Sequence, residues 1–135
     1  TEIKREGYYD LEIVDTLLSK SSDTELFPIT FMFIRVRMGD RYFSRDAIFR
    51  IMDFIKGSMG KNHVTAELSK GYFVVIMYKT DLAAAEKTRE EMLSKWEAFS
   101  KGAELETVLR EVVSTENPRN TFYHEKDRLL DLANW

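Results

Sequence analysis

The stretch Val64–Lys79, VTAELSKGYFVVIMYK, decides the fold of this chain. Its first half alternates between apolar and polar residues, which is typical of a half-buried strand. Its second half, Tyr72–Tyr78, is an unbroken apolar run and predicts a strand buried on both faces. Gly71 can adopt the positive φ that a tight turn at Ser69–Gly71 requires. The stretch therefore predicts a β-hairpin.

Two helices and a strand are expected before this hairpin. The run Ile29–Arg37, ITFMFIRVR, is dense in Ile, Phe and Val and predicts a central strand. Apolar residues at helical spacing predict a helix over Tyr9–Lys20, which Asp10 can cap. A second helix is expected between the N-cap Ser44 and a stop at Gly57.

Two helices and one ambiguous segment are expected after the hairpin. Asp81 can cap a long helix, Leu82–Ser100, and Thr121 can cap a final helix. Leu105–Ser114 has the spacing of a helix but the Thr and Val content of a strand, and we interpret it as a strand that completes the sheet. The side chains expected to face inward from the two helices are Leu82, Ala85, Met92, Trp96, Phe99, Phe122, Leu129, Leu130 and Leu132.

This order of elements predicts an α+β fold, with a ferredoxin-like βαββαβ sheet and flanking helices. We expect the sheet to be mostly antiparallel and its helices to lie on one face. With 135 residues and 44% apolar content, the chain fits a single domain, residues 1–135. Because position 1 is Thr, we expect that domain to be excised from a larger protein.

Composition excludes several classes of function. The net charge of −3 gives no general attraction to nucleic acid or to an anionic membrane. No apolar run approaches the roughly 20 residues that a membrane span needs, so no direct membrane insertion is expected. The chain has no cysteine, which excludes disulfides and thiolate metal sites and fits a cytoplasmic location.

The segment AELSKGYFVVIMYKTDLAAAEKTREEML, which begins at Ala66, resembles the core of the GGDEF domain. In that family a hairpin turn of sequence GGDEF leads into an apolar strand and then an amphipathic helix. Ile29–Arg37 resembles the strand that carries the family's first metal-binding Asp, and Asp46 falls where the next helix often has an Asp. The five positions that correspond to the turn are Ser69, Lys70, Gly71, Tyr72 and Phe73, and only Gly71 and Phe73 are close to the family pattern.

The resemblance implies a chemistry that these residues do not support. Active members condense two GTP molecules into cyclic di-GMP, with carboxylates at the first strand and at the turn holding Mg²⁺. Here Arg35 and Arg37 end the strand, and Lys70 and Tyr72 stand in the turn. Cations at these positions repel a metal ion, and Asp40 lies past the strand. We therefore expect no enzyme activity, no metal site and no cofactor.

The family's inhibitory product site, an Arg-x-x-Asp before the turn, is also absent, because the matching window Thr65–Leu68 reads TAEL. The resemblance thus favours a degenerate GGDEF-like module for regulatory signalling or protein–protein interaction in a bacterial protein. Its partners would be other proteins or adjacent domains of the same chain. An alternative is that the chain is the cytoplasmic part of a membrane protein.

An alternative is a nucleotide sensor, in which the basic end of the sheet binds cyclic di-GMP or GTP without metal. The tentative ligand-binding residues are Arg35, Arg37, Lys70 and Tyr72. The simpler interpretation is that these charges only solubilise strand ends and a turn. His63 and His124 lack an acid and a nucleophile in a matching pattern, so neither is predicted to be catalytic.

Overall fold

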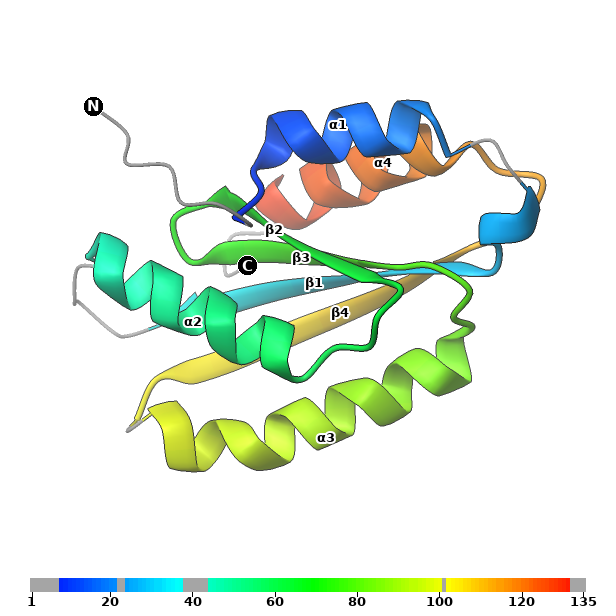
Figure 1. Cartoon of the computed structure of the whole chain (residues 1–135). Helices are drawn as coiled ribbons and strands as arrows, with labels where there is room; N and C mark the ends of the chain where they lie inside the picture. The colour runs from blue at the N-terminus through cyan, green and yellow to red at the C-terminus, as the bar shows by residue number, and fades with distance from the viewer. Residues whose placement is uncertain (1–7, 22–23, 38–43, 101, 132–135) are drawn as a thin grey trace.

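The predicted order of helices and strands is confirmed in a computed structural model, which describes residues 8–21, 24–37, 44–100 and 102–131 (Figure 1). The strand interpretation of Leu105–Ser114 is also confirmed, because this segment contributes most of the last strand. The elements in chain order are α1 (Leu11–Ser19), the 3-10 helix η1 (Thr24–Leu26), β1 (Ile29–Arg37), α2 (Arg45–Gly57), β2 (His63–Ser69), β3 (Tyr72–Met77), α3 (Leu82–Ser100), β4 (Glu104–Val112) and α4 (Pro118–Asp131).

The four strands form one antiparallel sheet in the order β2-β3-β1-β4. This is the ferredoxin-like arrangement that the sequence predicts. The hairpin turn also forms as predicted, with Gly71 at φ 73°. Beyond the four strands, Tyr9 makes a single parallel bridge to Ala66 on the outer side of β2.

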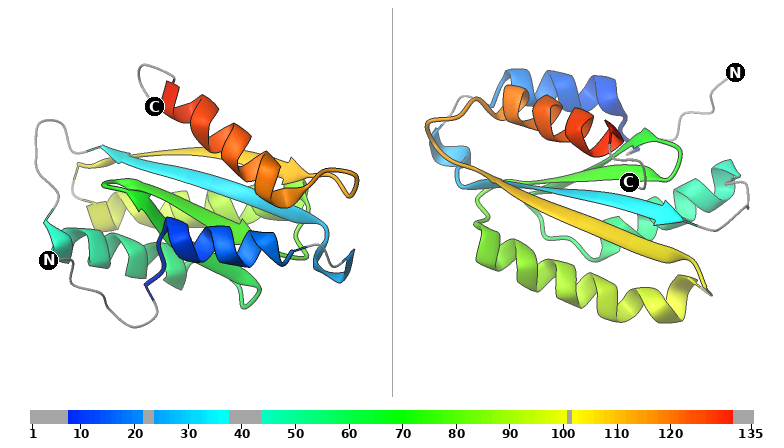
Figure 2. Two further views of the ribbon diagram at one scale, coloured as in Figure 1. Left: turned by 90° about the horizontal axis from the view of Figure 1, so that it is seen from above. Right: turned by 180° about the vertical axis from the view of Figure 1, so that it is seen from behind.

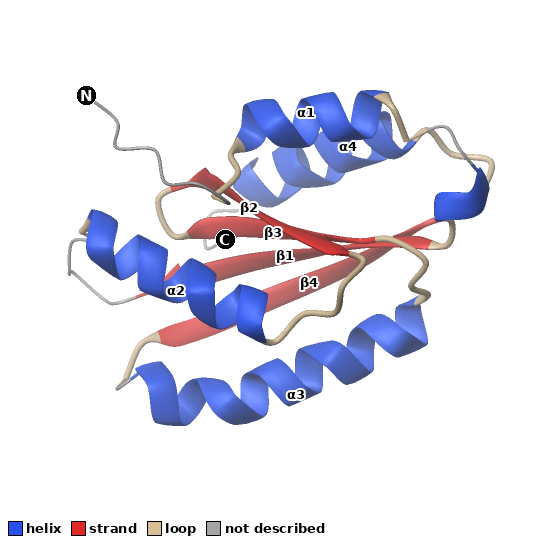
Figure 3. Cartoon of the chain, viewed as in Figure 1, coloured by secondary structure: helices blue, strands red, loops and turns tan. Residues whose placement is uncertain are grey.

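The prediction that all helices lie on one face is wrong. Figure 3 shows α1 and α4 on one face of the sheet and α2 and α3 on the other. The physical reason lies in β1, whose apolar side chains alternate between the two faces, with Phe33 toward α4 and Ile34 toward α2 and α3. A strand that is apolar on both faces needs a helix layer on each side to exclude water.

The helix ends follow capping chemistry with two departures from expectation. The side chains of Asp10, Ser44 and Asp81 accept hydrogen bonds from backbone N–H groups in the first turns of α1, α2 and α3, as predicted. The helix α2 ends at Gly57 as predicted, but Gly57 is its last helical residue and Ser58 is the C-cap. The last helix starts earlier than expected.

The early start of α4 has a clear local cause. The side chain of Asn117 accepts a hydrogen bond from the backbone N–H of Asn120, so Asn117, and not Thr121, is the capping residue. Pro118 then occupies the first helical position, where its missing N–H has no cost. Thr121 is instead buried within the helix.

Most of the predicted inward side chains are buried. Ala85, Met92 and Trp96 on α3, and Phe122 and Leu129 on α4, belong to the two cores. The predictions for three others are wrong, because Leu82, Phe99 and Leu130 are exposed at their positions. Asp40 and Leu132 lie outside the residues that the structure describes.

His63 links the start of β2 to the end of β3. Its Nδ1 accepts a hydrogen bond from the backbone N–H of Gly60 at 3.1 Å, and its Nε2 lies 3.3 Å from Oγ1 of Thr80. An accepting Nδ1 requires the neutral ring, and burial lowers the pKa of His63 below its usual 6.5. The folded protein therefore binds this proton less readily than the unfolded chain.

We expect the free energy of unfolding to decline as the pH falls below about 6.5 and to level off below the folded-state pKa of His63. Urea unfolding between pH 8 and pH 5 measures this dependence. In His63→Gln the decline should shrink, whereas His124→Gln, on the exposed side of α4, should retain it. An unchanged decline in His63→Gln would show that other groups cause it.

Candidate functional site

The structure brings the end of β1 beside the hairpin turn. The backbone N–H of Val36 donates a hydrogen bond to the carbonyl of Gly71 at 2.8 Å. One residue earlier, Arg35 is the cross-strand partner of Tyr72. The two places that the GGDEF resemblance marks for metal ligands are therefore neighbours in space, at one end of the sheet.

The side chain of Tyr72 points away from that end and into the protein. Because β3 alternates, Tyr72 shares the α1 and α4 face with Val74 and Ile76, and it is fully buried there. Its ring lies 6.3 Å from the ring of Phe33, and its hydroxyl is 3.5 Å from the carbonyl oxygen of Lys126 on α4. This burial raises the pKa of Tyr72 far above its usual value. Tyr72 is thus part of the core under α4.

The arginines at the end of β1 lie among aromatic and acidic groups. The guanidinium of Arg35 is 5.9 Å from the centre of the Tyr72 ring. Nε of Arg37 lies 3.0 Å from Oε1 of Glu106 on β4, and Glu104 is its cross-strand partner. The positive charge at this end of the sheet is therefore partly neutralised within the fold.

The remaining predicted site residues divide between the turn tip and the opposite core. Ser69 and Lys70 are exposed at the tip, whereas Phe73 is buried against the layer of α2 and α3. The structure thus brings Arg35 and Tyr72 together, pairs Arg37 with Glu106, and leaves Lys70 at the surface. From this position, Lys70 could contact only a ligand that binds at the exposed surface of the turn.

These residues do not fit a Mg²⁺ site. The ion prefers carboxylate oxygens, and the end of β1 and the turn offer guanidinium groups, an ammonium group and a buried phenol. Within the described ranges, no group of three His, Asp or Glu side chains is placed to hold a metal ion. The nearby carboxylate of Glu106 already contacts Arg37.

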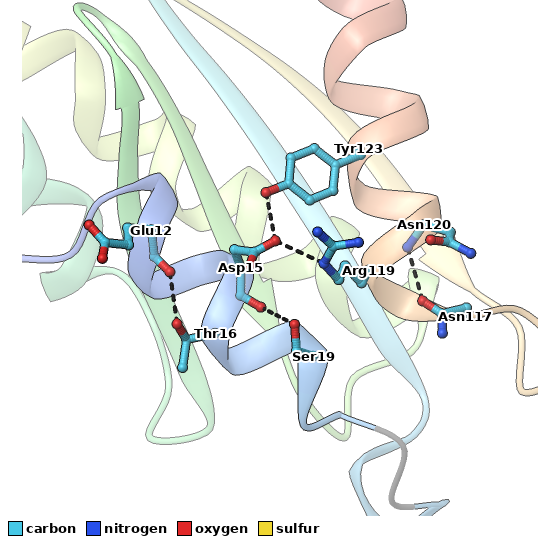
Figure 4. Close-up of polar contacts among 8 residues, drawn as sticks. All are labelled: Glu12, Asp15, Thr16, Ser19, Asn117, Arg119, Asn120 and Tyr123. Atoms are coloured by element: carbon cyan, nitrogen blue, oxygen red, sulfur yellow. Dashed lines mark hydrogen bonds and ion pairs between the residues drawn. The ribbon is translucent and has the colours of Figure 1, made fainter.

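A second polar cluster, which the sequence did not predict, joins α1 to α4 (Figure 4). Oδ1 of Asp15 accepts hydrogen bonds from the hydroxyl of Tyr123 and from Nε of Arg119, each at 2.8 Å. These contacts, above all the hydrogen bond from Tyr123, lower the pKa of Asp15. No local pattern marks the cluster, because Asp15 lies more than 100 residues from Arg119 and Tyr123 in the chain.

A groove of about 340 Å³ lies beside this cluster, where α1 ends and α4 begins. Its lining includes Ser21, whose hydroxyl lies 3.1 Å from the hydroxyl of Tyr78 and donates a hydrogen bond to the carbonyl of Leu17. The polar groups around the groove therefore make contacts within the protein. We interpret the cluster as the connection that holds α1 and α4 together on their face of the sheet.

Comparisons with known proteins establish the class of fold. No protein-family model and no curated protein matches the sequence. Among solved structures, the GGDEF domain of FimX from Pseudomonas aeruginosa superposes with a TM-score of 0.72 at 11% identity, over 95% of this chain and 91% of that one.

Two further structures show the same similarity. A DGC protein from Thermotoga maritima gives a TM-score of 0.69 at 15% identity, over 89% of this chain and 92% of that one. The GGDEF domain of YfiN (or TpbB) from Pseudomonas aeruginosa gives 0.65 at 16% identity, over 88% of this chain and 85% of that one. The chain therefore has the α+β fold of GGDEF domains, and the resemblance seen in the hairpin is confirmed at the level of the fold.

Substitution of Tyr72 tests whether its position belongs to the core. Tyr72→Phe removes the hydroxyl, whose contact with the Lys126 carbonyl is long, and should cost less than about 1 kcal/mol. Tyr72→Glu would bury a carboxylate among aromatic rings and should cost more than about 3 kcal/mol or prevent folding. Urea unfolding of both variants measures the difference. Equal stability of Tyr72→Glu and the wild type would show that this position can carry an acid at the surface.

Proposed function

We propose that this chain is a catalytically inactive GGDEF-like module that serves regulatory signalling or protein–protein interaction. The fold supports a signalling domain. The proposal of inactivity rests on one observation, the burial of Tyr72 beneath α4 at a turn position where an active member would place an acid. Arg35 and Arg37 extend the same argument to the end of β1, since a cation repels the metal that cyclisation needs.

A neighbouring structure supports the proposal of a larger parent protein. LapD from Vibrio cholerae, described as an S helix-GGDEF-EAL protein bound to c-di-GMP, superposes with a TM-score of 0.50 at 18% identity. The match covers 78% of this chain but 27% of LapD. We infer that this chain likewise works beside other domains of a bacterial signalling protein, in the cytoplasm. Within its described residues, no helix is long and apolar enough to cross a membrane.

The nucleotide sensor is the second candidate. Arg35 lies near the surface end of the sheet, and Lys70 is exposed beside it in the turn, so both could meet a phosphate. Two features weigh against it: Arg37 pairs with Glu106, and Tyr72 is buried. A phosphate at this end would also approach the carboxylates of Glu104 and Glu106, which repel it.

Incubation with GTP and either Mg²⁺ or Mn²⁺ tests the inactive assignment directly. We expect no cyclic di-GMP by mass spectrometry under conditions in which a diguanylate cyclase, assayed in parallel, converts its substrate completely. Cyclic di-GMP formed in proportion to the concentration of this protein would refute the proposal.

Calorimetric titration with GTP and with cyclic di-GMP separates the two candidates. An interaction module should give no saturable heat with either nucleotide. Saturable binding that Arg35→Ala or Lys70→Ala abolishes, and that Lys87→Ala on the exposed side of α3 leaves intact, would establish the sensor instead.

A further inference from the structure

The outer edge of β4 is one of the two edges of the sheet. In the view from behind, β4 is the strand nearest the reader, between α4 above and α3 below (Figure 2, right). Its nine residues, Glu104–Val112, contain no proline, and its pairing with β1 runs without a bulge. An edge of this kind presents a row of backbone donors and acceptors that can pair with another strand. Near its end, the carbonyl of Glu111 accepts a hydrogen bond from Arg110, and the N–H of Val113 donates one to Glu116.

The opposite edge, along β2, is partly occupied. The backbone N–H of Glu67 donates to the carbonyl of Tyr9 at 2.9 Å, so the segment before α1 already occupies part of it. The guanidinium of Arg45 also binds both carboxylate oxygens of Glu67 at 3.0 Å. The outer edge of β4 is therefore the better candidate for pairing with an added strand.

We propose that β4 pairs with β4 of a second copy of this chain, antiparallel and centred on Val108, which makes one continuous sheet across a two-fold axis. A two-fold interface must be complementary to itself. In this register Val108 faces Val108 of the second copy, and the numbers of any two facing residues sum to 216. The partner of every residue of β4 is therefore defined.

Charge selects this register on the α4 face of the sheet. Glu106 faces Arg110 of the second copy, and the two-fold axis makes the same pair twice. Both side chains are about one-third exposed, so they can be reached from outside. Glu106 already contacts Arg37, and Arg110 contacts Glu116 at 2.7 Å. A carboxylate accepts several hydrogen bonds and a guanidinium has five donors, so the intermolecular pair adds to these contacts.

An apolar contact supports the register on the α3 face. Val113, directly after β4, is 50% exposed. In the proposed pairing it lies opposite Ala103 of the second copy, at a groove of about 510 Å³ between α3 and the start of β4. Leu93, Trp96 and Leu105 supply apolar lining to this groove. Val113 at the C-terminal end of β4 in one copy thus contacts the apolar groove at the N-terminal end of β4 in the second copy.

Three other symmetric registers are poorer. Pairing centred on Glu106 or on Arg110 would place like charges opposite each other, which is unfavourable. Pairing centred on Thr107 would place Val113 of the second copy beyond Gly102, past the start of β4, and would replace the Glu106 pair with one from Glu104. The charged residues on β4 therefore disfavour the registers centred on Glu106 and on Arg110, and the contact of Val113 with the groove distinguishes the register centred on Val108 from the one centred on Thr107.

This self-association goes beyond the proposed function and does not depend on it. The hairpin turn plays no part in the pairing, and Arg37 at the end of β1 enters it only through its contact with Glu106. A cyclase assay can therefore refute the proposed function without refuting the dimer, and a measurement of oligomeric state can refute the dimer without refuting the proposed function.

Cysteine cross-linking tests the pairing, since the chain contains no cysteine of its own. Directly facing residues on antiparallel strands have Cα atoms about 4.5–5.5 Å apart, which a disulfide can bridge. We expect Val108→Cys to form a disulfide-linked dimer under mild oxidation. Thr107→Cys, its neighbour in sequence, should cross-link at least about tenfold more slowly because its counterpart is offset. Lys87→Cys, exposed on α3, is a control for random collision.

Sedimentation velocity of the uncross-linked chain gives the equilibrium result. We expect a concentration-dependent monomer–dimer equilibrium in the wild type. Val113→Asp, which changes an exposed side chain, should weaken the dimer about tenfold or more without changing the thermal unfolding of the monomer. A wild-type chain that remains monomeric to about 1 mM would overturn the proposal, as would faster cross-linking of Thr107→Cys or Lys87→Cys.

A charge exchange separates the intermolecular pair from contacts within one chain. Arg110→Glu and Glu106→Arg should each lose self-association, because each places like charges opposite each other twice. Mixing the two variants should restore a dimer that contains one copy of each. Circular dichroism must first show that both variants are folded. No mixed dimer from two folded variants would contradict the register.

Discussion

Burial of β1 and β3 on both faces is the constraint on which the rest of the structure depends. Every residue from Ile29 to Ile34 and from Tyr72 to Met77 is buried. A large apolar side chain contributes about 1.5–3 kcal/mol when it moves from water into such a core, so each face needs its own pair of helices. The register that buries these strands also brings Val36 beside Gly71, and it thereby fixes the geometry of the candidate site.

The buried strands and most of the helices could be predicted from the sequence. Fewer of the contacts between segments far apart in the chain could be predicted. Ile29–Arg37 has the predicted ends because its composition and its flanking breaks agree. Contacts between distant segments, such as that between Asp15 and Tyr123, could not be predicted because they leave no local pattern. The apolar run Tyr72–Tyr78 did indicate burial on both faces, and a helix layer on each face follows from that burial. Phe99 fits an inward stripe by spacing, yet it lies near the end of α3, where its ring stacks on Phe54 at 4.6 Å and remains partly exposed.

The segments that form the candidate site could be predicted from the sequence. The directions in which their side chains point could not. Resemblance to GGDEF domains placed the end of β1 beside the turn, and the structure has them in contact. It did not reveal that Tyr72 is buried under α4, or that Arg37 is paired with Glu106 from β4. Both follow from the alternation of side chains along neighbouring strands, once the order of the strands is known. Because of the same alternation, the side chains along β4 differ between the two faces of the sheet.

The central claim is that the end of β1 and the hairpin turn do not hold a divalent metal ion. Paramagnetic Mn²⁺, added in the presence of GTP to the isotopically labelled protein, tests it most directly through the amide NMR signals of Val36 and Gly71. We expect these signals to broaden no more than those of exposed residues on α3. Selective broadening of Val36 and Gly71 at stoichiometric Mn²⁺ would place a metal beside the turn and contradict the claim.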